Sequence, residues 1–126
     1  MIYVEAHGAR IPALGFGTFR LEGQTAERMI GAALEIGYRH IDTAQMYGNE
    51  AEVGRAIAGS GVARSEIWLT TKIWPDNFRD GALQRAAEAS VRRLRTVPDL
   101  LLLHWPNPSV PLAETMRGFE IGRAHV

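Results

Sequence analysis

Cysteine is absent from this 126-residue chain, which excludes disulfides, thiolate metal sites and a cysteine nucleophile. Net charge is absent too: 14 basic and 14 acidic residues balance, so the chain lacks the basic excess of nucleic-acid and anionic-membrane binders. No apolar run approaches the roughly 20 residues of a membrane span, and the first residues lack the pattern of a signal peptide. We therefore expect a cytoplasmic protein with no nucleic-acid or membrane partner.

Histidine is sparse, and its spacing is unlike that of metal ligands. The four histidines are His7, His40, His104 and His125. With no cysteine beside them, they predict no metal site. What the chain does contain is a 46% hydrophobic fraction, which is typical of a soluble core, in a length that suits one ordinary domain.

Apolar periodicity predicts four helices, at residues 24–36, 49–58, 83–94 and 111 to about 118. The third is the clearest, because its apolar side recurs at helical spacing through Leu83, Ala86, Ala87, Ser90, Val91 and Leu94. The first has a similar stripe, made of Ala26, Met29, Ile30, Ala33 and Leu34. Asn49 is expected to cap the second helix.

Short β-type runs separate these helices. The predicted strands are 2–5 and 10–12, which form a hairpin, and then 14–18, 40–44, 67–74 and 100–103. The last is a continuous run of four leucines, as expected for a parallel strand buried on both faces. This α/β alternation of about four βα units predicts a parallel sheet with helices outside it. The spacing alone does not choose between an open doubly wound sheet and a (β/α)8 barrel.

Polar side chains gather where successive strands end. Asp42 and Tyr47 accompany the strand at 40–44, Lys72 stands near the end of the next, and His104 directly follows the last. Right-handed βαβ crossovers place these strands side by side, all running the same way. The four side chains should therefore meet at the rim where catalytic groups collect in such folds.

Together these groups suit a proton-donor site. An ammonium beside a phenol stabilises the phenolate, and Asp42, paired with Lys72, would hold that ammonium in place. The imidazole of His104 can orient a substrate oxygen. The set has no serine nucleophile, carboxylate pair or metal, so it does not suggest a hydrolase. It instead favours a reaction in which an oxygen is protonated while its carbon receives a nucleophile.

Two competing interpretations fit the chain less well. Gly15-Phe16-Gly17 begins like a dinucleotide-binding fingerprint, but Arg20 occupies the third glycine position. An unrelated βα-repeat enzyme of phosphate chemistry is disfavoured because no glycine-rich phosphate loop is present.

At the same residues the chain closely resembles the aldo-keto reductases. The first signature of that family is fitted by residues 37–44, Glu50 and Val53-Gly54. Its other N-terminal landmarks are fitted by residues 14–19, 71–74 and 103–106. The match extends from residue 11 to about 118. Within it, the amino-acid sequence is most similar to bacterial 2,5-diketogluconate and methylglyoxal reductases.

This resemblance implies a (β/α)8 TIM barrel that reduces aldehydes and ketones to alcohols with NADPH. It implies a small carbonyl substrate of the keto-sugar-acid or 2-oxoaldehyde class and a monomeric full-length enzyme. The implied catalytic residues are Asp42, Tyr47, Lys72 and His104, with Tyr47 as proton donor. Those near the nicotinamide ribose are Gly17, Thr18 and Asp42. The implied substrate-binding residues are Phe19, Tyr47, Trp74, His104 and Trp105; for the three aromatics Phe19, Trp74 and Trp105, ordinary core packing is the alternative.

The chain also departs from the family. A (β/α)8 barrel needs about 250 residues, so we expect residues 1–118 to form the N-terminal half of one, a truncated half-barrel without activity of its own. Residues 119–126 are expected to be a non-native tail, because residues 120–126 back-translate to a common sequencing-adapter sequence. A non-catalytic regulatory or binding protein on the same fold remains the alternative function.

Overall fold

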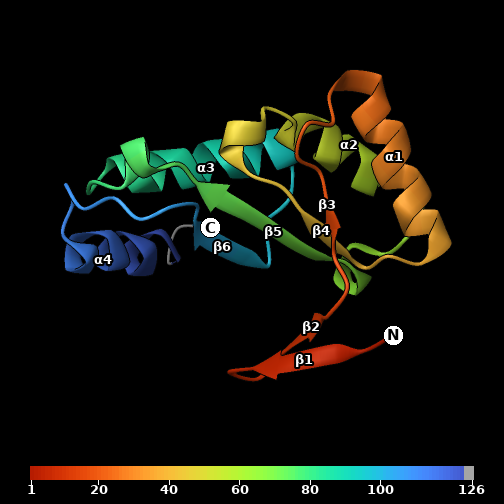
Figure 1. The fold of residues 1–126 in the computed structure, drawn as a ribbon, viewed down its shortest axis with the longest axis horizontal. Helices are drawn as coiled ribbons and strands as arrows, with labels where there is room; N and C mark the ends of the chain where they lie inside the picture. The colour runs from red at the N-terminus through yellow and green to blue at the C-terminus, as the bar shows by residue number, and fades with distance from the viewer. Residues whose placement is uncertain (124–126) are drawn as a thin grey trace.

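The computed structural model describes the backbone of residues 1–123 and the side chains of residues 1–120. Strands β1 (Tyr3–Ala6) and β2 (Ala9–Pro12) form an antiparallel hairpin. A parallel sheet follows, in the order β3 (Phe16–Gly17), β4 (His40–Asp42), β5 (Trp68–Ile73) and β6 (Leu100–Leu103). The helices that follow these strands are α1 (Gly23–Ile36), α2 (Glu50–Gly59), α3 (Ala82–Leu94) and α4 (Leu112–Arg123). Figure 1 shows the hairpin standing clear of the helices.

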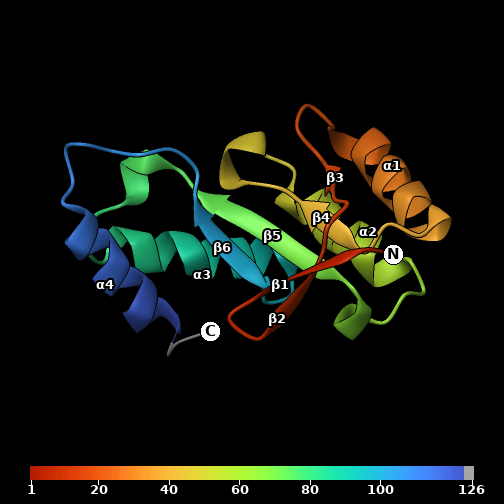
Figure 2. The same cartoon turned by 60° about the horizontal axis from the view of Figure 1, so that its bottom comes forward.

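The helices pack on one another in chain order, α1 on α2, α2 on α3 and α3 on α4, and they cover one face of the sheet. Figure 2 shows this arrangement from a second direction. In β5, Leu69 and Ile73 point to the helices and are fully buried, whereas Lys72 lies on the opposite face. An open doubly wound sheet carries helices on both faces, so the one-sided arrangement favours a barrel-type sheet.

Two apolar clusters fill the space between sheet and helices. One joins β4 and β5 to α1 and α2, through residues such as Ile41, Leu69 and Ile30. The other joins β5 and β6 to α3 and α4, through residues such as Ile73 and Leu83. These clusters fix the helices against the strands whose ends carry the polar side chains.

Helices α2 and α3 approach each other closely at Gly54. A Cβ built at this position would collide with the backbone carbonyl of Leu94, at the end of α3. Glycine is therefore required at this position because there is no room for a side chain. Backbone conformation is not the reason, since Gly54 is not among the glycines with a positive φ angle.

Several predictions of element position were confirmed, and two expectations about burial were wrong. Met29 was expected in the buried stripe of α1 but is 46% exposed, because the buried side of α1 runs through Ala26, Ile30, Ala33 and Leu34. Strand β6 was expected to be buried on both faces, yet Leu102 is 38% exposed. In this chain β6 is an edge strand with helices on only one of its faces.

Three short 3-10 turns were not predicted: η1 (Gln45–Tyr47), η2 (Arg64–Glu66) and η3 (Pro75–Asn77). Helix α4 continues beyond the predicted end at residue 118. Of the predicted tail, residues 119–123 continue this helix, and residues 124–126 lie outside the described residues. Across residues 1–123 no helix is long and apolar enough to cross a membrane.

Candidate active site

The ends of β4 and β5 bring Asp42 and Lys72 into contact. The ammonium of Lys72 donates to Asp42 Oδ2 at 2.7 Å and to the Thr43 carbonyl at 3.0 Å. The pairing of β4 with β5 sets Asp42 beside Thr70, so Lys72, two residues further on, points to the same face of the sheet. The Lys72 side chain is only 15% exposed. Lys72 is also the only lysine in the chain.

Tyr47 reaches this pair from the short turn η1. Ala44 is extended before the turn, and Gly48 ends it with a left-handed φ of 66°. This change of direction returns the phenol over the strand end, where the Tyr47 hydroxyl oxygen lies 3.4 Å from Lys72 Nζ. The ammonium also lies 5.0 Å from the centre of the Tyr47 ring, so it faces both the phenol oxygen and the ring.

His104 completes the group from the end of β6. Its backbone N–H donates to the Ile73 carbonyl at 3.0 Å, which continues the β5–β6 pairing beyond Leu103. Its ring meets the Tyr47 ring edge-on, with 5.6 Å between the ring centres. Burial lowers the pKa of His104 from its ordinary value; the nearby charge of Lys72 lowers it further, and Asp42 partly opposes this. The shift therefore favours the neutral form of the imidazole near pH 7.

Three aromatic rings border these four side chains. Phe19 lies 5.1 Å from Tyr47 between ring centres, and Trp74 lies 5.3 Å from His104. Trp105 packs against Trp74 at 5.7 Å. Phe19 and Trp105 are 61% and 62% exposed, so neither is a core residue in this structure, while Trp74 is half-buried. The rings form an apolar border around the polar centre.

Gly17 and Thr18 lie next to Asp42 at the end of β3. Gly17 pairs with Asp42 across the sheet, and no heavy atom lies within 4 Å of where a Cβ would stand. Thr18 is fully buried, and both its backbone N–H and its hydroxyl donate to the Asp42 carbonyl at 3.0 Å. Its hydroxyl proton is thus used to join the two strand ends.

Sequence reasoning missed the role of Asn49. The residue stands at the N-cap position of α2, as predicted, but its side chain makes no capping hydrogen bond. Its amide instead donates to the carbonyls of Thr18 and Leu21, at 2.8 and 3.0 Å, and accepts from the Thr43 hydroxyl at 2.6 Å. Asn49 therefore ties the segment after β3 to the end of β4.

Glu50 was also missed as a buried charge. Its side chain is 1% exposed and accepts from the Thr71 hydroxyl at 2.7 Å and from Arg93 Nε at 2.8 Å. Because Thr71 immediately precedes Lys72, the buried carboxylate of Glu50 and its partner Arg93 support β5 from the side opposite the candidate site. The only sequence signal was the place of Glu50 in the family signature, since local spacing does not reveal a partner 43 residues away.

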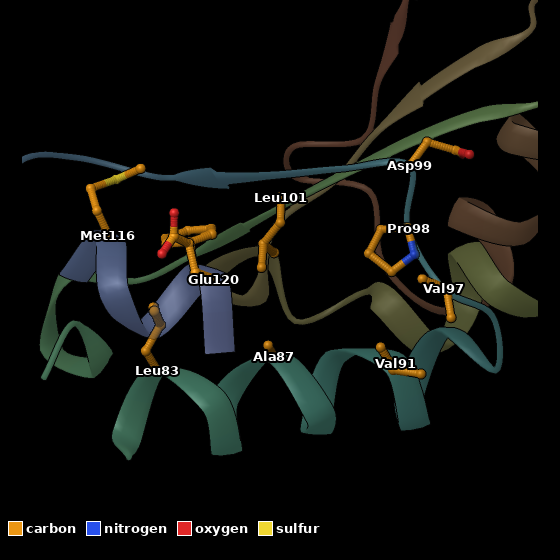
Figure 3. A pocket seen from close by; sticks show the side chains of 10 residues that line it. Leu83, Ala87, Val91, Val97, Pro98, Asp99, Leu101, Met116 and Glu120 are labelled. Atoms are coloured by element: carbon orange, nitrogen blue, oxygen red, sulfur yellow. The ribbon is translucent and has the colours of Figure 1, made fainter. Parts of the chain in front are cut away.

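An apolar cavity of about 500 Å³ lies elsewhere, between α3, α4 and the start of β6 (Figure 3). Leu83, Ala87 and Leu101 line it from the helical side of the sheet. None of the four clustered polar residues contributes to its wall. We interpret this cavity as space between packed helices, separate from the candidate site.

Comparison with known proteins agrees with the geometry. The sequence profile described as "Aldo/keto reductase family" matches residues 13–124. Methylglyoxal reductase DkgB of Salmonella typhi is 52% identical over 99 residues, which are 78% of this chain and 37% of that protein. The crystal structure of a protein assigned as a 2,5-diketo-D-gluconic acid reductase B has a TM-score of 0.91 at 52% identity, covering 98% of this chain and 44% of the other.

A more distant structure, the Bombyx mori aldo-keto reductase AKR2E4 in complex with NADP, has a TM-score of 0.87 at 31% identity and covers 98% of this chain and 47% of the other. The chain thus spans less than half the length of these relatives, whose fold is a (β/α)8 barrel, and its sheet and four helices form part of such a barrel. The prediction of fold and family is confirmed. The chain belongs to the aldo/keto reductase family.

Proposed function

We propose that this chain forms the part of an NADPH-dependent carbonyl reductase that carries the proton donor, Tyr47. This proposal rests on the position of the Lys72 ammonium between a carboxylate and a phenol. Lys72 Nζ lies 2.7 Å from Asp42 Oδ2 and 3.4 Å from the Tyr47 hydroxyl oxygen. A charged group held this way stabilises a phenolate, and the donor is therefore suited to release its proton.

The residues at the end of β3 and β4 fit a nicotinamide cofactor. Gly17 leaves open space beside Asp42. Lys72 bonds to Oδ2 of Asp42, and no described residue donates to Oδ1, which could accept a hydrogen bond from a ribose hydroxyl. The hydrogen bond from Thr18 to the Asp42 carbonyl would keep the ends of β3 and β4 in a fixed relative position. The bound cofactor would supply a hydride to the carbonyl carbon of the substrate.

Tyr47 gives its proton to the carbonyl oxygen, and the product is an alcohol. The phenolate that remains lies beside the Lys72 ammonium, which stabilises it until a proton from solvent restores the phenol. Asp42 keeps the ammonium at the strand end. The largely buried position of the Lys72 side chain strengthens this electrostatic effect, because water screens it less.

His104 orients the carbonyl. Its Nδ1 is buried and has no hydrogen-bond partner among the described residues. Because buried N–H groups without an acceptor are rare, the neutral ring would carry its proton on Nε2, where it can donate to a substrate oxygen. Phe19, Trp74 and Trp105 provide apolar walls around that oxygen. The names of the relatives support a small 2-oxoaldehyde or keto-sugar acid as substrate.

The activity belongs to a complete barrel, and we propose that residues 1–126 alone lack it. Binding energy from remote parts of a cofactor is what positions the reacting atoms, and this chain spans less than half of its relatives. For the tests we define the completed barrel as the Salmonella typhi relative in which residues 1–118 of this chain replace the corresponding N-terminal segment.

The test is Tyr47→Phe in the completed barrel, with methylglyoxal and NADPH. We expect kcat to fall by about 10²–10⁴-fold with the Kd for NADPH unchanged, because the phenol acts only as negative charge develops on oxygen. Tyr38→Phe is the matched control, since Tyr38 packs its ring on Phe16 away from Lys72. If Tyr47→Phe keeps more than about a tenth of kcat, Tyr47 is not the proton donor.

The same assay tests the alternative of a non-catalytic binding protein. A completed barrel that folds and binds NADPH yet reduces none of methylglyoxal, 2,5-diketogluconate or a simple aldehyde would favour a binding or regulatory role.

A further inference from the structure

Tyr47 lies on a short turn that few local hydrogen bonds stabilise. The turn η1 has three residues, and its described backbone hydrogen bonds run from Tyr47 to Ala44 and from Gly48 to Gln45, both at 3.1 Å. A single 3-10 turn is geometrically poorer than an α-helix. Something beyond the turn must therefore fix the phenol relative to Lys72, which is held on a different element.

Gln45, the first residue of η1, supplies three long-range hydrogen bonds. Its Oε1 accepts from the backbone N–H of Trp74 at 3.3 Å. Its Nε2 donates to the Ala86 carbonyl at 2.8 Å and to the Ser90 hydroxyl at 3.1 Å. The amide therefore joins the turn carrying Tyr47 to the residue two places after Lys72 and to helix α3.

The contacts continue behind the sheet to the other side of Lys72. Ser90 is fully buried and also accepts from Arg93, at 3.4 Å. Arg93 pairs with Glu50, which accepts from the Thr71 hydroxyl at 2.7 Å. Thr71 precedes Lys72 directly. The residues on both sides of Lys72 are thus tied, through α3, to the turn that carries Tyr47.

We infer that Gln45 is a positioning residue that sets the separation between the Tyr47 hydroxyl and Lys72 Nζ. This inference rests on the proposed function, in which that separation controls proton donation. Among the described residues, the Gln45 amide bonds to backbone groups and to Ser90, and none of these bonds is to Tyr47 or Lys72. It therefore acts through the elements that carry them.

The test is Gln45→Met in the completed barrel, because methionine keeps the length and the apolar stem but makes none of the three hydrogen bonds. We expect kcat to fall roughly 10- to 100-fold, as small misplacements of reacting groups do, with the Kd for NADPH unchanged. Gln45→Glu retains an acceptor for the Trp74 N–H but sets a carboxylate oxygen against the Ala86 carbonyl, so we expect a loss at least as large as in Gln45→Met.

Gln84→Met is the matched control. Gln84 also uses its whole amide, accepting from Gly81 N–H at 2.7 Å and donating to Asp80 at 2.9 Å, but it supports only the start of α3. We expect this variant to lose stability and keep kcat. A direct readout without cofactor is the NMR signal of ¹³Cζ-labelled Tyr47, which should shift in Gln45→Met and not in Gln84→Met.

Two results would overturn the positioning role. One is a Gln45→Met protein with a lower melting temperature, unchanged kcat and an unmoved Tyr47 signal. The other is a loss of kcat matched by an equal loss in Gln84→Met. Tyr47→Phe, assayed in parallel, separates the two proposals: retained activity there contradicts the proton-donor assignment, whereas the Tyr47 signal still reports whether Gln45 positions the phenol.

Discussion

The hydroxyl oxygen of Tyr47 lies 3.4 Å from the ammonium nitrogen of Lys72, although 25 positions separate the two residues in the chain. One stands on a turn and the other on a strand, so the contact depends on how these elements are held together. At this distance a charge on either group is felt directly by the other. We therefore expect the two residues to act as a unit.

Lys72→Met in the completed barrel should reduce kcat about as strongly as Tyr47→Phe, roughly 10²–10⁴-fold, because the phenolate loses its neighbouring charge. The double variant should lose far less than the product of the two single losses, since contacting residues are not additive. The measurement is a double-mutant cycle on kcat. Multiplicative losses would show that the two groups work independently.

His104 should make stability depend on pH. Burial and Lys72 lower its pKa in the folded protein from an ordinary value of 6.5. As pH falls below that value, the unfolded chain binds a proton that the folded site resists, so the free energy of unfolding decreases. We expect His104→Gln to lose less stability than the parent between about pH 7.5 and pH 5.5. The measurement is urea unfolding of the completed barrel at both pH values, and parallel losses in the two proteins would contradict it.

The polypeptide of residues 1–126, made by itself, should aggregate or form dimers. Strands β3 and β6 are both sheet edges, and the face away from the helices exposes Leu102. An unpaired strand edge can form hydrogen bonds with a strand of another chain, and apolar residues beside it favour such association. Size-exclusion chromatography with light scattering is the measurement, and the completed barrel is the control. A monomer with a cooperative thermal transition and dispersed amide NMR signals would refute this expectation.

The arrangement of Asp42, Tyr47, Lys72 and His104 could be predicted because parallel βα units place successive strand ends at one rim. That rule needs only the order of strands and helices, which hydrophobic periodicity supplies. The exposure of Leu102 could not be predicted in the same way, because a run of leucines has the same pattern at an edge and at the centre of a sheet.

The polar contacts behind the site were beyond sequence reasoning for another reason. Asn49 and Glu50 occupy ordinary positions at the start of a helix, and their types suit capping and the first turn. Their actual partners, such as Thr18 and Arg93, are brought near by tertiary packing of separate elements. Burial of a polar side chain depends on such packing and leaves little trace in local spacing.

The close approach of α2 and α3 at Gly54 makes this helical contact sensitive to substitution. Gly54 shares α2 with Glu50, and the Leu94 carbonyl it touches directly follows Arg93. A side chain at position 54 would force the two helices apart at the place where that ion pair forms. Loss of activity in a random-mutagenesis library would therefore map to the outer, helical surface of the sheet as well as to the rim that faces the substrate.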